Sequence, residues 1–231
     1  KTGLYPLYVA YSLHRQRKKD FEATGGLIDD PDNYSVEEEQ VIWDDILANN
    51  VYVICNTPMA RRITERTLLG FRKLNMREGN ERLNIKSEQL IRRATDDREA
   101  LISDLLSEGF WHGDKRNKNI MKFGAVVGNP PYQVVNKGNG NGADPIYHTF
   151  IDIARAVSPR GTLIHPARFL FNAGKTPKDW NQQFLNDPHV KVMDYWASSM
   201  EVFPTADVKG DIVVTYWDRN KDFGAIGFFS A

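Results

Sequence analysis

Gly128-Asn129-Pro130-Pro131-Tyr132 follows the apolar run Phe123-Gly124-Ala125-Val126-Val127 in this chain of 231 residues. Strand-type residues that end in this way predict a buried strand whose backbone leaves the sheet at its carboxyl end. Proline has no N–H to donate to a neighbouring strand, and it favours extended geometry in the residue before it. In an open α/β sheet, ligands bind at the carboxyl ends of the strands. The stretch therefore predicts a strand and, directly after it, a ligand site.

The residues after this strand offer two hydrogen-bond acceptors and an aromatic ring. Asn129 presents a side-chain carbonyl, Pro130 has a backbone carbonyl with no N–H on its own residue, and Tyr132 has an aromatic face. Two acceptors and a flat ring suit an amino group on a planar heterocycle. The alternative interpretation is a proline-stiffened turn that binds nothing.

The tetrapeptide Asn129-Pro130-Pro131-Tyr132 resembles the catalytic motif of amino-group methyltransferases that use S-adenosylmethionine (SAM). These enzymes are chiefly the adenine-specific DNA N6-methyltransferases of bacterial type II restriction–modification systems. The same tetrapeptide occurs in enzymes that methylate the side-chain amide of protein glutamine. The resemblance therefore implies methylation of a nitrogen, and other parts of the chain must distinguish the two substrates.

Composition and charge limit the classes of protein to which this chain can belong. With 41% hydrophobic and 26% charged residues, the chain has the make-up of a soluble globular protein. Its net charge of zero is not the basic signature of a free-standing DNA binder. Basic clusters at 15–19, 61–62, 92–93 and 115–118 are typical of solvated helix faces and loop ends. No apolar run approaches membrane-spanning length and no signal peptide opens the chain, so we expect no membrane partner.

Cysteine and histidine usage favours a cytoplasmic protein without a metal, and the resemblance implies that the cytoplasm is bacterial. Cys55 is the single cysteine, which excludes an internal disulfide and is typical of a reducing compartment. The five histidines and Cys55 show no spacing typical of metal ligands, and no metal site is predicted.

The first residues resemble part of the family's SAM loop. Lys1-Thr2-Gly3 opens a helical stretch at 8–13 and would match the last three positions of the loop Asp-Pro-x-x-Gly-x-Gly, which wraps the methionine part of SAM. Lys1 stands where the first of these glycines is expected, and the strand before the loop is missing. The alternative is a plain N-capped helix. Because the chain begins at Lys1 without a methionine, we interpret it as an excerpt of a longer protein.

A second segment resembles the motif that holds the ribose of SAM. A strand is predicted at 51–54, and a helix is predicted to begin at Thr57-Pro58. Cys55 stands where the family has an acidic residue for the ribose hydroxyls, and Asn56 or Thr57 would substitute. A small buried side chain is the simpler interpretation of Cys55. Taken together, the resemblance implies that SAM is bound by Thr2, Gly3, Asn56, Thr57 and Asn129.

The rest of the chain alternates helices with strands. Helices are predicted after the capping box at Ser35-Val36-Glu37-Glu38, at 87–109, after Asp144-Pro145 and around 180–185. Strands are predicted at 161–166, 190–196 and within 208–217. Such alternation is typical of a doubly wound α/β domain.

Two further loops bear on function. Gly138-Asn139-Gly140-Asn141-Gly142 cannot hold one conformation unaided, and it is either a flexible surface loop or a lid over the reacting base. Phe203 precedes the last predicted strand. The resemblance implies that Phe203 stacks on the flipped base opposite Tyr132, and the alternative is a core phenylalanine that anchors the loop.

The sequence therefore predicts a doubly wound, Rossmann-like α/β fold of the SAM-dependent methyltransferases, incomplete at the N-terminal strand. We expect residues 1–231 to form the catalytic domain, with a helical insertion at 74–122 before the catalytic strand. The expected function is site-specific adenine N6-methylation of double-stranded DNA with a flipped adenine, in a restriction–modification system with separate or fused target-recognition and nuclease domains. The catalytic residues would be Asn129, Pro130, Pro131 and Tyr132. Glutamine-amide methylation and a catalytically inactive module with a methylase fold are the alternatives.

Overall fold

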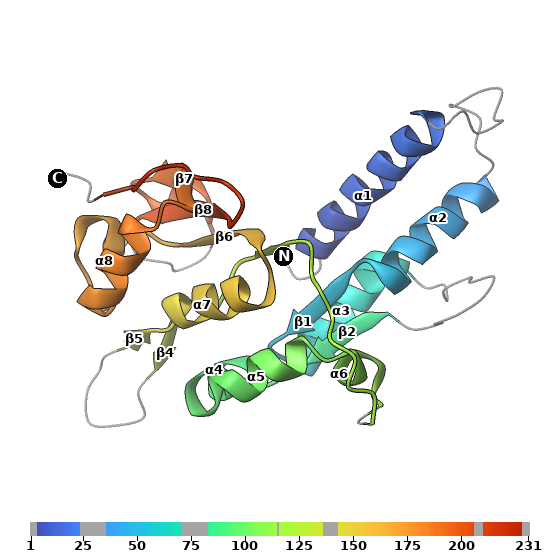
Figure 1. The fold of residues 1–231 in the computed structure, drawn as a ribbon, viewed down its shortest axis with the longest axis horizontal. Helices are drawn as coiled ribbons and strands as arrows, with labels where there is room; N and C mark the ends of the chain where they lie inside the picture. The colour runs from blue at the N-terminus through green and yellow to red at the C-terminus, as the bar shows by residue number, and fades with distance from the viewer. Residues whose placement is uncertain are drawn as a thin grey trace. The chain divides into compact units, whose positions relative to one another are not determined.

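A computed structural model describes residues 4–23, 36–70, 83–114, 116–135, 143–205 and 210–227. The chain divides into two compact units (Figure 1). The first unit comprises Lys1–Leu90 and Gly109–Arg116, and the second comprises Ile91–Glu108 and Asn117–Ala231. Within the described ranges, no helix has the length and apolarity that a membrane crossing requires.

The first unit packs three helices against a pair of parallel strands. The helices are α1 (Leu4–Ala23), α2 (Val36–Asn49) and α3 (Pro58–Leu69), and the strands are β1 (Tyr52–Cys55) and β2 (Asn84–Ser87). Tyr52 lies opposite Asn84 in the parallel register. The core is formed by apolar side chains from all five elements, among them Ala10, Ile46, Leu47, Val51, Leu68 and Ile85. Buried Asn84 also donates from Nδ2 to the carbonyl oxygen of Ala48 at 2.5 Å, which ties β2 to the end of α2.

Helix α3 begins where the local sequence predicts. The Thr57 hydroxyl accepts the amide of Ala60 at 3.1 Å, and Pro58 occupies the first turn, where its missing N–H costs nothing. The helix ends before Gly70, which adopts φ +64°. The capping box proposed at Ser35 falls partly outside the described residues, although α2 does begin at Val36.

The single helix predicted for residues 87–109 is wrong in two respects. Ser87 belongs to β2, a strand that was not predicted within the interval 74–122. The helical part is then divided into α4 (Leu90–Asp96), α5 (Arg98–Leu105) and α6 (Glu108–His112). The break after α4 has a local cause, because Asp97 turns out of the helix and its side chain accepts the amide of Ala100 at 3.0 Å.

The second unit contains a mixed four-stranded sheet in the order β3-β6-β8-β7. These strands are β3 (Val126–Gly128), β6 (Arg160–Pro166), β7 (Val190–Trp196) and β8 (Ile212–Asp218). β3 runs parallel to β6, whereas β8 runs antiparallel to both β6 and β7. β3, β6 and β7 therefore point the same way, and their carboxyl ends meet at one edge of the sheet, which we call the carboxyl edge.

This unit also contains helices α7 (Tyr147–Val157) and α8 (Lys178–Asn186), two short 3-10 helices, η1 (Arg168–Phe171) and η2 (Ser199–Glu201), and a hairpin of β4 (Gln133–Val135) and β5 (Ala143–Pro145). Residues 91–108, with α5 and most of α4, belong to it as well. Asp144 and Pro145 were expected to cap α7, but both lie in β5. The residue at the N-cap of α7 is Ile146, which makes no side-chain cap. The pairing of Val134 with Asp144 in the hairpin outweighs the local capping signal.

The strand before the Asn129 motif is shorter and more exposed than predicted. The run 123–127 was expected to be a buried strand, but β3 begins at Val126 and the side chain of Val127 is 44% exposed. β3 stands at the end of the strand order and pairs only with β6 among the described strands. The two strands approach closely, because a Cβ at Gly161 would lie 2.4 Å from the carbonyl oxygen of Val126.

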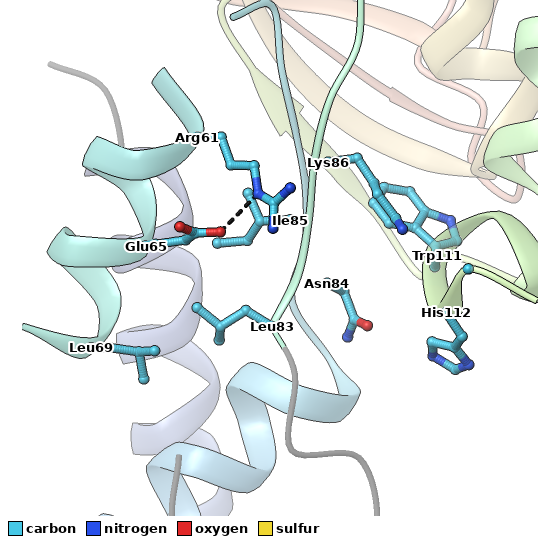
Figure 2. A pocket seen from close by; sticks show the side chains of 10 residues that line it. Arg61, Glu65, Leu69, Leu83, Asn84, Ile85, Lys86, Trp111 and His112 are labelled. Carbon is cyan, nitrogen blue, oxygen red and sulfur yellow. Dashed lines mark hydrogen bonds and ion pairs between the residues drawn. The ribbon is translucent and has the colours of Figure 1, made fainter. Parts of the chain in front are cut away.

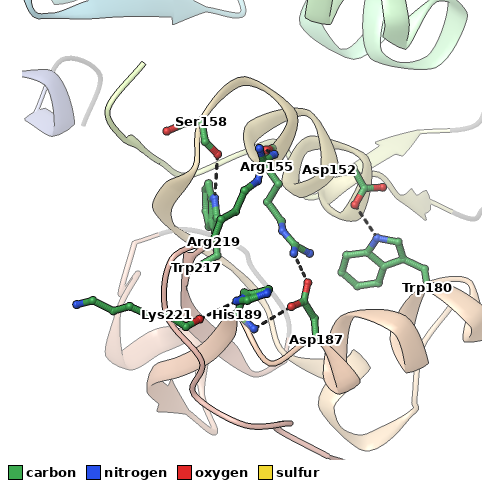
Figure 3. A network of polar contacts seen from close by, with 9 residues as sticks. All are labelled: Asp152, Arg155, Ser158, Trp180, Asp187, His189, Trp217, Arg219 and Lys221. Atoms are coloured by element: carbon green, nitrogen blue, oxygen red, sulfur yellow. Dashed lines mark hydrogen bonds and ion pairs between the residues drawn. The ribbon is translucent and has the colours of Figure 1, made fainter. Parts of the chain in front are cut away.

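A network of polar contacts lies at the opposite edge of the sheet, where β6 and β7 begin (Figure 3). Arg155 of α7 forms an ion pair with Asp187, and the amide of His189 donates to the same carboxylate at 2.8 Å. Burial opposes ionisation of Asp187, but these two donors together lower its pKa below the usual value. Trp217 donates to the carbonyl of Ser158 at 3.3 Å, and His189 Nδ1 donates to the carbonyl of Lys221 at 2.7 Å. These contacts hold the turns at this edge of the sheet.

The protein is thus a mixed α/β structure, with parallel strands in both units and one antiparallel strand inserted in the larger sheet. The predicted strands at 161–166 and 190–196 are confirmed, and the last strand is β8. The doubly wound, Rossmann-like arrangement of the whole chain stays a prediction.

Candidate active site

The predicted motif leaves the sheet at the carboxyl edge, directly after β3. Asn129 is exposed, while Pro130, Pro131 and Tyr132 are half-buried. The carbonyl oxygen of Tyr132 accepts the amide of Ile146 at 3.0 Å. The motif loop is therefore held at one end by the pairing of β3 with β6 and at the other by the start of α7. An exposed amide side chain on a loop anchored at both ends is suited to meet a ligand in a defined place.

A buried aromatic and polar cluster supports this loop from the sheet. His165, near the end of β6, is fully buried and pairs through Nε2 with the hydroxyl of Thr215 at 2.8 Å. The ring of Tyr147, the first residue of α7, stacks on the His165 ring with centroids 5.5 Å apart. The Tyr147 hydroxyl in turn pairs with that of Thr176 at 2.8 Å. The cluster joins β8, β6, α7 and the loop after η1, so that the start of α7, and with it the motif loop, has a fixed position.

Burial determines the protonation of this cluster. Desolvation lowers the pKa of His165 to about 4, although its contact with the Pro166 carbonyl acts in the opposite direction. Desolvation likewise raises the pKa of the Tyr147 phenol. Both rings are therefore neutral at physiological pH, and they act as packing and hydrogen-bonding groups.

Phe203 belongs to the same edge of the sheet. It follows β7 and η2, is half-buried, and donates its amide to the carbonyl of Ser199 at 2.7 Å. The amide of Ser199 donates to the carbonyl of Gly210 at 3.0 Å, and the amide of Ala167 donates to the carbonyl of Asp211 at 3.0 Å. The loops after β6 and β7 and the entry to β8 are thereby connected. Sheet topology brings Phe203 and Asn129 to one edge from positions more than seventy residues apart.

The residues predicted to hold the ribose lie in the first unit, at the carboxyl end of β1. Asn56 and Thr57 are exposed, and the Thr57 hydroxyl is used as the cap of α3. Cys55 is buried, with its sulfur 3.7 Å from the hydroxyl of Thr64, and burial raises the pKa of the thiol. The interpretation of Cys55 as a small buried residue is confirmed. Thr2, Gly3 and the glycine-rich segment 138–142 lie outside the described residues.

Two residues at these strand ends were not singled out from the sequence. Glu88 follows β2 and donates its amide to the carbonyl of Cys55 at 2.9 Å, so a carboxylate-bearing residue stands beside the position where the family has an acid. Glu88 was not singled out because β2 was not predicted as a strand and Glu88 was therefore not placed at a strand end. Arg168 follows β6 at the carboxyl edge. The proline that ends β6 was the available sign that the next residues leave the sheet there.

A pocket of about 370 Å³ lies elsewhere in the first unit, against α3, β2 and α6 (Figure 2). The ion pair of Arg61 with Glu65, at 2.7 Å, lines one side, and Trp111 and His112 lie on the other. None of the residues predicted from the motifs lines it. In the part of the chain that the structure describes, no group of three His, Cys, Asp or Glu side chains is placed to hold a metal ion.

Comparison with known proteins places the chain in a family. The family model of the Eco57I restriction-modification methylases matches residues 49–203, which include β1, the motif loop and Phe203. The chain belongs to this family, which confirms the resemblance to adenine methyltransferases of restriction–modification systems. It is also 29% identical over 119 residues to an "Uncharacterized adenine-specific methylase" from Mycoplasma pneumoniae (strain ATCC 29342 / M129 / Subtype 1). That alignment covers 50% of this chain and 28% of the relative, so the chain corresponds to a minor part of that protein.

Proposed function

We propose that this chain provides the catalytic machinery of a site-specific DNA adenine N6-methyltransferase of a restriction–modification system. The observation that carries the proposal is the exposed amide of Asn129, on an anchored Asn-Pro-Pro-Tyr loop at the carboxyl edge, in a chain of this family. The exocyclic amine of adenine is paired inside the duplex, so the target base must leave the helix to be reached.

Tyr132 and Phe203 are proposed to receive the flipped base between them. Both have aromatic faces, both are half-buried, and both lie on loops of the carboxyl edge. Stacking of a base on an aromatic side chain contributes about 1–3 kcal/mol per contact. Such contacts hold the plane of the adenine, and a held plane directs its amino group toward the acceptors of the motif.

Asn129 and Pro130 are proposed to bind the amino group itself. The Asn129 side-chain oxygen and the Pro130 carbonyl would each accept one of its two hydrogens. Acceptors on both hydrogens increase electron density on the nitrogen and stabilise the positive charge that develops on it as it is methylated. The methyl group is supplied by SAM, whose sulfonium carries it in an electrophilic form. No cysteine nucleophile is needed, in agreement with the burial of Cys55.

The polar residues that follow β1 and β3 have the hydrogen-bonding groups that a ligand such as SAM requires. Asn56 and Asn129 are exposed and offer both donors and acceptors, and the backbone at the start of the twelve-residue helix α3 favours a polar or anionic ligand end. We propose Asn56, Thr57 and Asn129, with Thr2 and Gly3, as the SAM-binding residues, and Glu88 as a further carboxylate for the ribose hydroxyls. Double-stranded DNA is the proposed partner, with fused or separate target-recognition and nuclease domains, in the bacterial cytoplasm.

The proposal is tested by methyl transfer from tritiated SAM to two substrates offered separately. One is duplex DNA of mixed sequence, digested to nucleosides afterwards, and the other is a release-factor-type protein with an accessible glutamine. We expect label in N6-methyladenine and none in protein. Label on glutamine would assign the chain to the other group of enzymes with this tetrapeptide. SAM binding measured by calorimetry distinguishes both from a catalytically inactive module.

A further inference from the structure

Arg168 is an exposed cation that the fold holds in a defined place at the carboxyl edge. It begins η1, two residues after the end of β6. Its guanidinium lies against Gly210, where a Cβ would be 3.1 Å from Nε and 3.2 Å from Nη2. The stem passes Gly174, where a Cβ would be 3.4 Å from the Arg168 Cβ and 3.6 Å from Cδ. The side chain therefore occupies a path between two glycines.

Both glycines have backbone conformations that other residues rarely adopt. Gly174 has φ +79° and Gly210 has φ +99°. The backbone of Arg168 is fixed as well, because its carbonyl accepts the amide of Ala173 at 3.0 Å within the turn that follows η1. An arginine held along its stem loses less conformational freedom when its head binds a ligand than a freely rotating one.

The head of this arginine is available for an anion. Among the described residues Arg168 forms no ion pair, whereas Arg155 in the same unit is paired with Asp187. A guanidinium presents a planar fork of donors that matches the oxygens of a phosphate and binds two of them at once. The geometry points to a phosphate-binding role.

Strand order indicates which phosphate is in reach. β6 lies between β3, which Asn129 follows directly, and the β8-β7 pair, where Phe203 lies in the loop after β7. The loop of Arg168 therefore stands between the two loops proposed to bind the flipped adenine. We propose that Arg168 binds a backbone phosphate of the DNA strand that bears the target adenine, beside the flipped nucleotide. This inference rests on the proposed function and adds a residue that positions the substrate.

The test is the salt dependence of DNA binding. The probe is a short duplex with one adenine opposite an abasic site, and binding is followed by fluorescence anisotropy over a range of salt concentrations. Each phosphate contact contributes about 0.9 to the slope of log affinity against log salt concentration. Arg168→Ala should reduce the slope by about that amount and leave SAM binding and thermal stability unchanged. Arg168→Lys should keep the slope and bind the probe more weakly, because it keeps the charge and loses the fork.

Arg160→Ala is the matched control, since Arg160 is an exposed arginine at the amino end of the same strand. It should behave as the wild type. If Arg168→Ala and Arg160→Ala give equal slopes while the wild type methylates DNA, the phosphate contact is wrong and the proposed function stands. If Arg168→Ala lowers the slope as predicted but the wild type methylates only protein, the proposed function fails, and so does the placement of the contact beside a target adenine, whereas a contact of Arg168 with a DNA phosphate stands. A wild type that does not bind DNA overturns both.

Discussion

The imidazole of His165 lies flat against the phenol ring of Tyr147, with planes 11° apart. His165 is near the carboxyl end of β6, and Tyr147 is the first residue of α7. The amide of Ile146, directly before Tyr147, holds the motif loop through the carbonyl of Tyr132. The ring pair therefore links the sheet to the loop that carries Asn129.

The first prediction concerns the pH dependence of stability. The folded state keeps His165 neutral down to a pKa of about 4, whereas the unfolded chain titrates near 6.5. Between these values the unfolded state binds more protons, so the free energy of unfolding should fall as the pH drops from about 6.5 to about 4, by up to about 3 kcal/mol. His165→Gln should flatten this part of the curve in urea titrations.

Tyr147→Phe should destabilise the protein. The substitution removes a hydrogen bond of 2.8 Å and leaves the buried hydroxyl of Thr176 without it, at a cost of about 1–3 kcal/mol. Adding Thr176→Val should recover part of the loss, because the second polar group is then removed. The exposed control is Tyr195→Phe, which loses a bond of 2.9 Å to Asp211 and should change the free energy of unfolding by less than about 0.5 kcal/mol. Equal effects at both tyrosines would contradict the role of burial.

Gly161→Ala should separate β3 from β6. A Cβ at this position would lie 2.3 Å from the Trp217 ring and 2.4 Å from the Val126 carbonyl, so backbone or ring must move, with a loss of at least about 1–3 kcal/mol. Methyl transfer should fall with stability, because the motif loop follows β3. Gly124→Ala is the control, since a Cβ there meets nothing within 4 Å. Its melting temperature should match that of the wild type or exceed it slightly.

Asn129→Ala should abolish most of the chemistry and leave the fold intact. Asn129 is exposed, so its removal creates no cavity. Loss of one acceptor that acts on developing charge should lower the rate of methyl transfer by about a hundredfold or more. Single-turnover transfer from labelled SAM measures the effect, and SAM binding by calorimetry is the control. Near-normal turnover of the variant would overturn the proposed mechanism.

Phe203→Ala separates base stacking from a core role. If Phe203 stacks on the flipped base, the variant should bind DNA containing an extrahelical adenine more weakly by about 1–3 kcal/mol, with little change in SAM binding. Phe223→Ala serves as the control, since Phe223 is also half-buried but follows β8 at the other edge and packs on Tyr216. Loss of thermal stability in Phe203→Ala without any loss of DNA affinity would assign Phe203 to the core.

Local sequence determined those features that depend on a few neighbouring residues. The prolines after Asn129 end β3 in any tertiary context, because they cannot donate to a ladder. Thr57 and Pro58 likewise start α3 through a cap and a first-turn proline that are complete within four residues. Family membership followed from such a local pattern, since the tetrapeptide is contiguous.

Tertiary structure decided what depends on partners far along the chain. β2 is a strand because Asn84 and Ile85 are buried beside β1, although its four residues carry no clear strand pattern. The same applies to Asp144, which pairs in a hairpin although its sequence favours a helix cap. His165, Phe203 and Arg168 acquire their positions from the strand order β3-β6-β8-β7, which contacts between distant segments determine. Propensity acts over a few residues, whereas burial and strand pairing act over the whole fold, and at the carboxyl edge it is burial and pairing that determine which side chains meet.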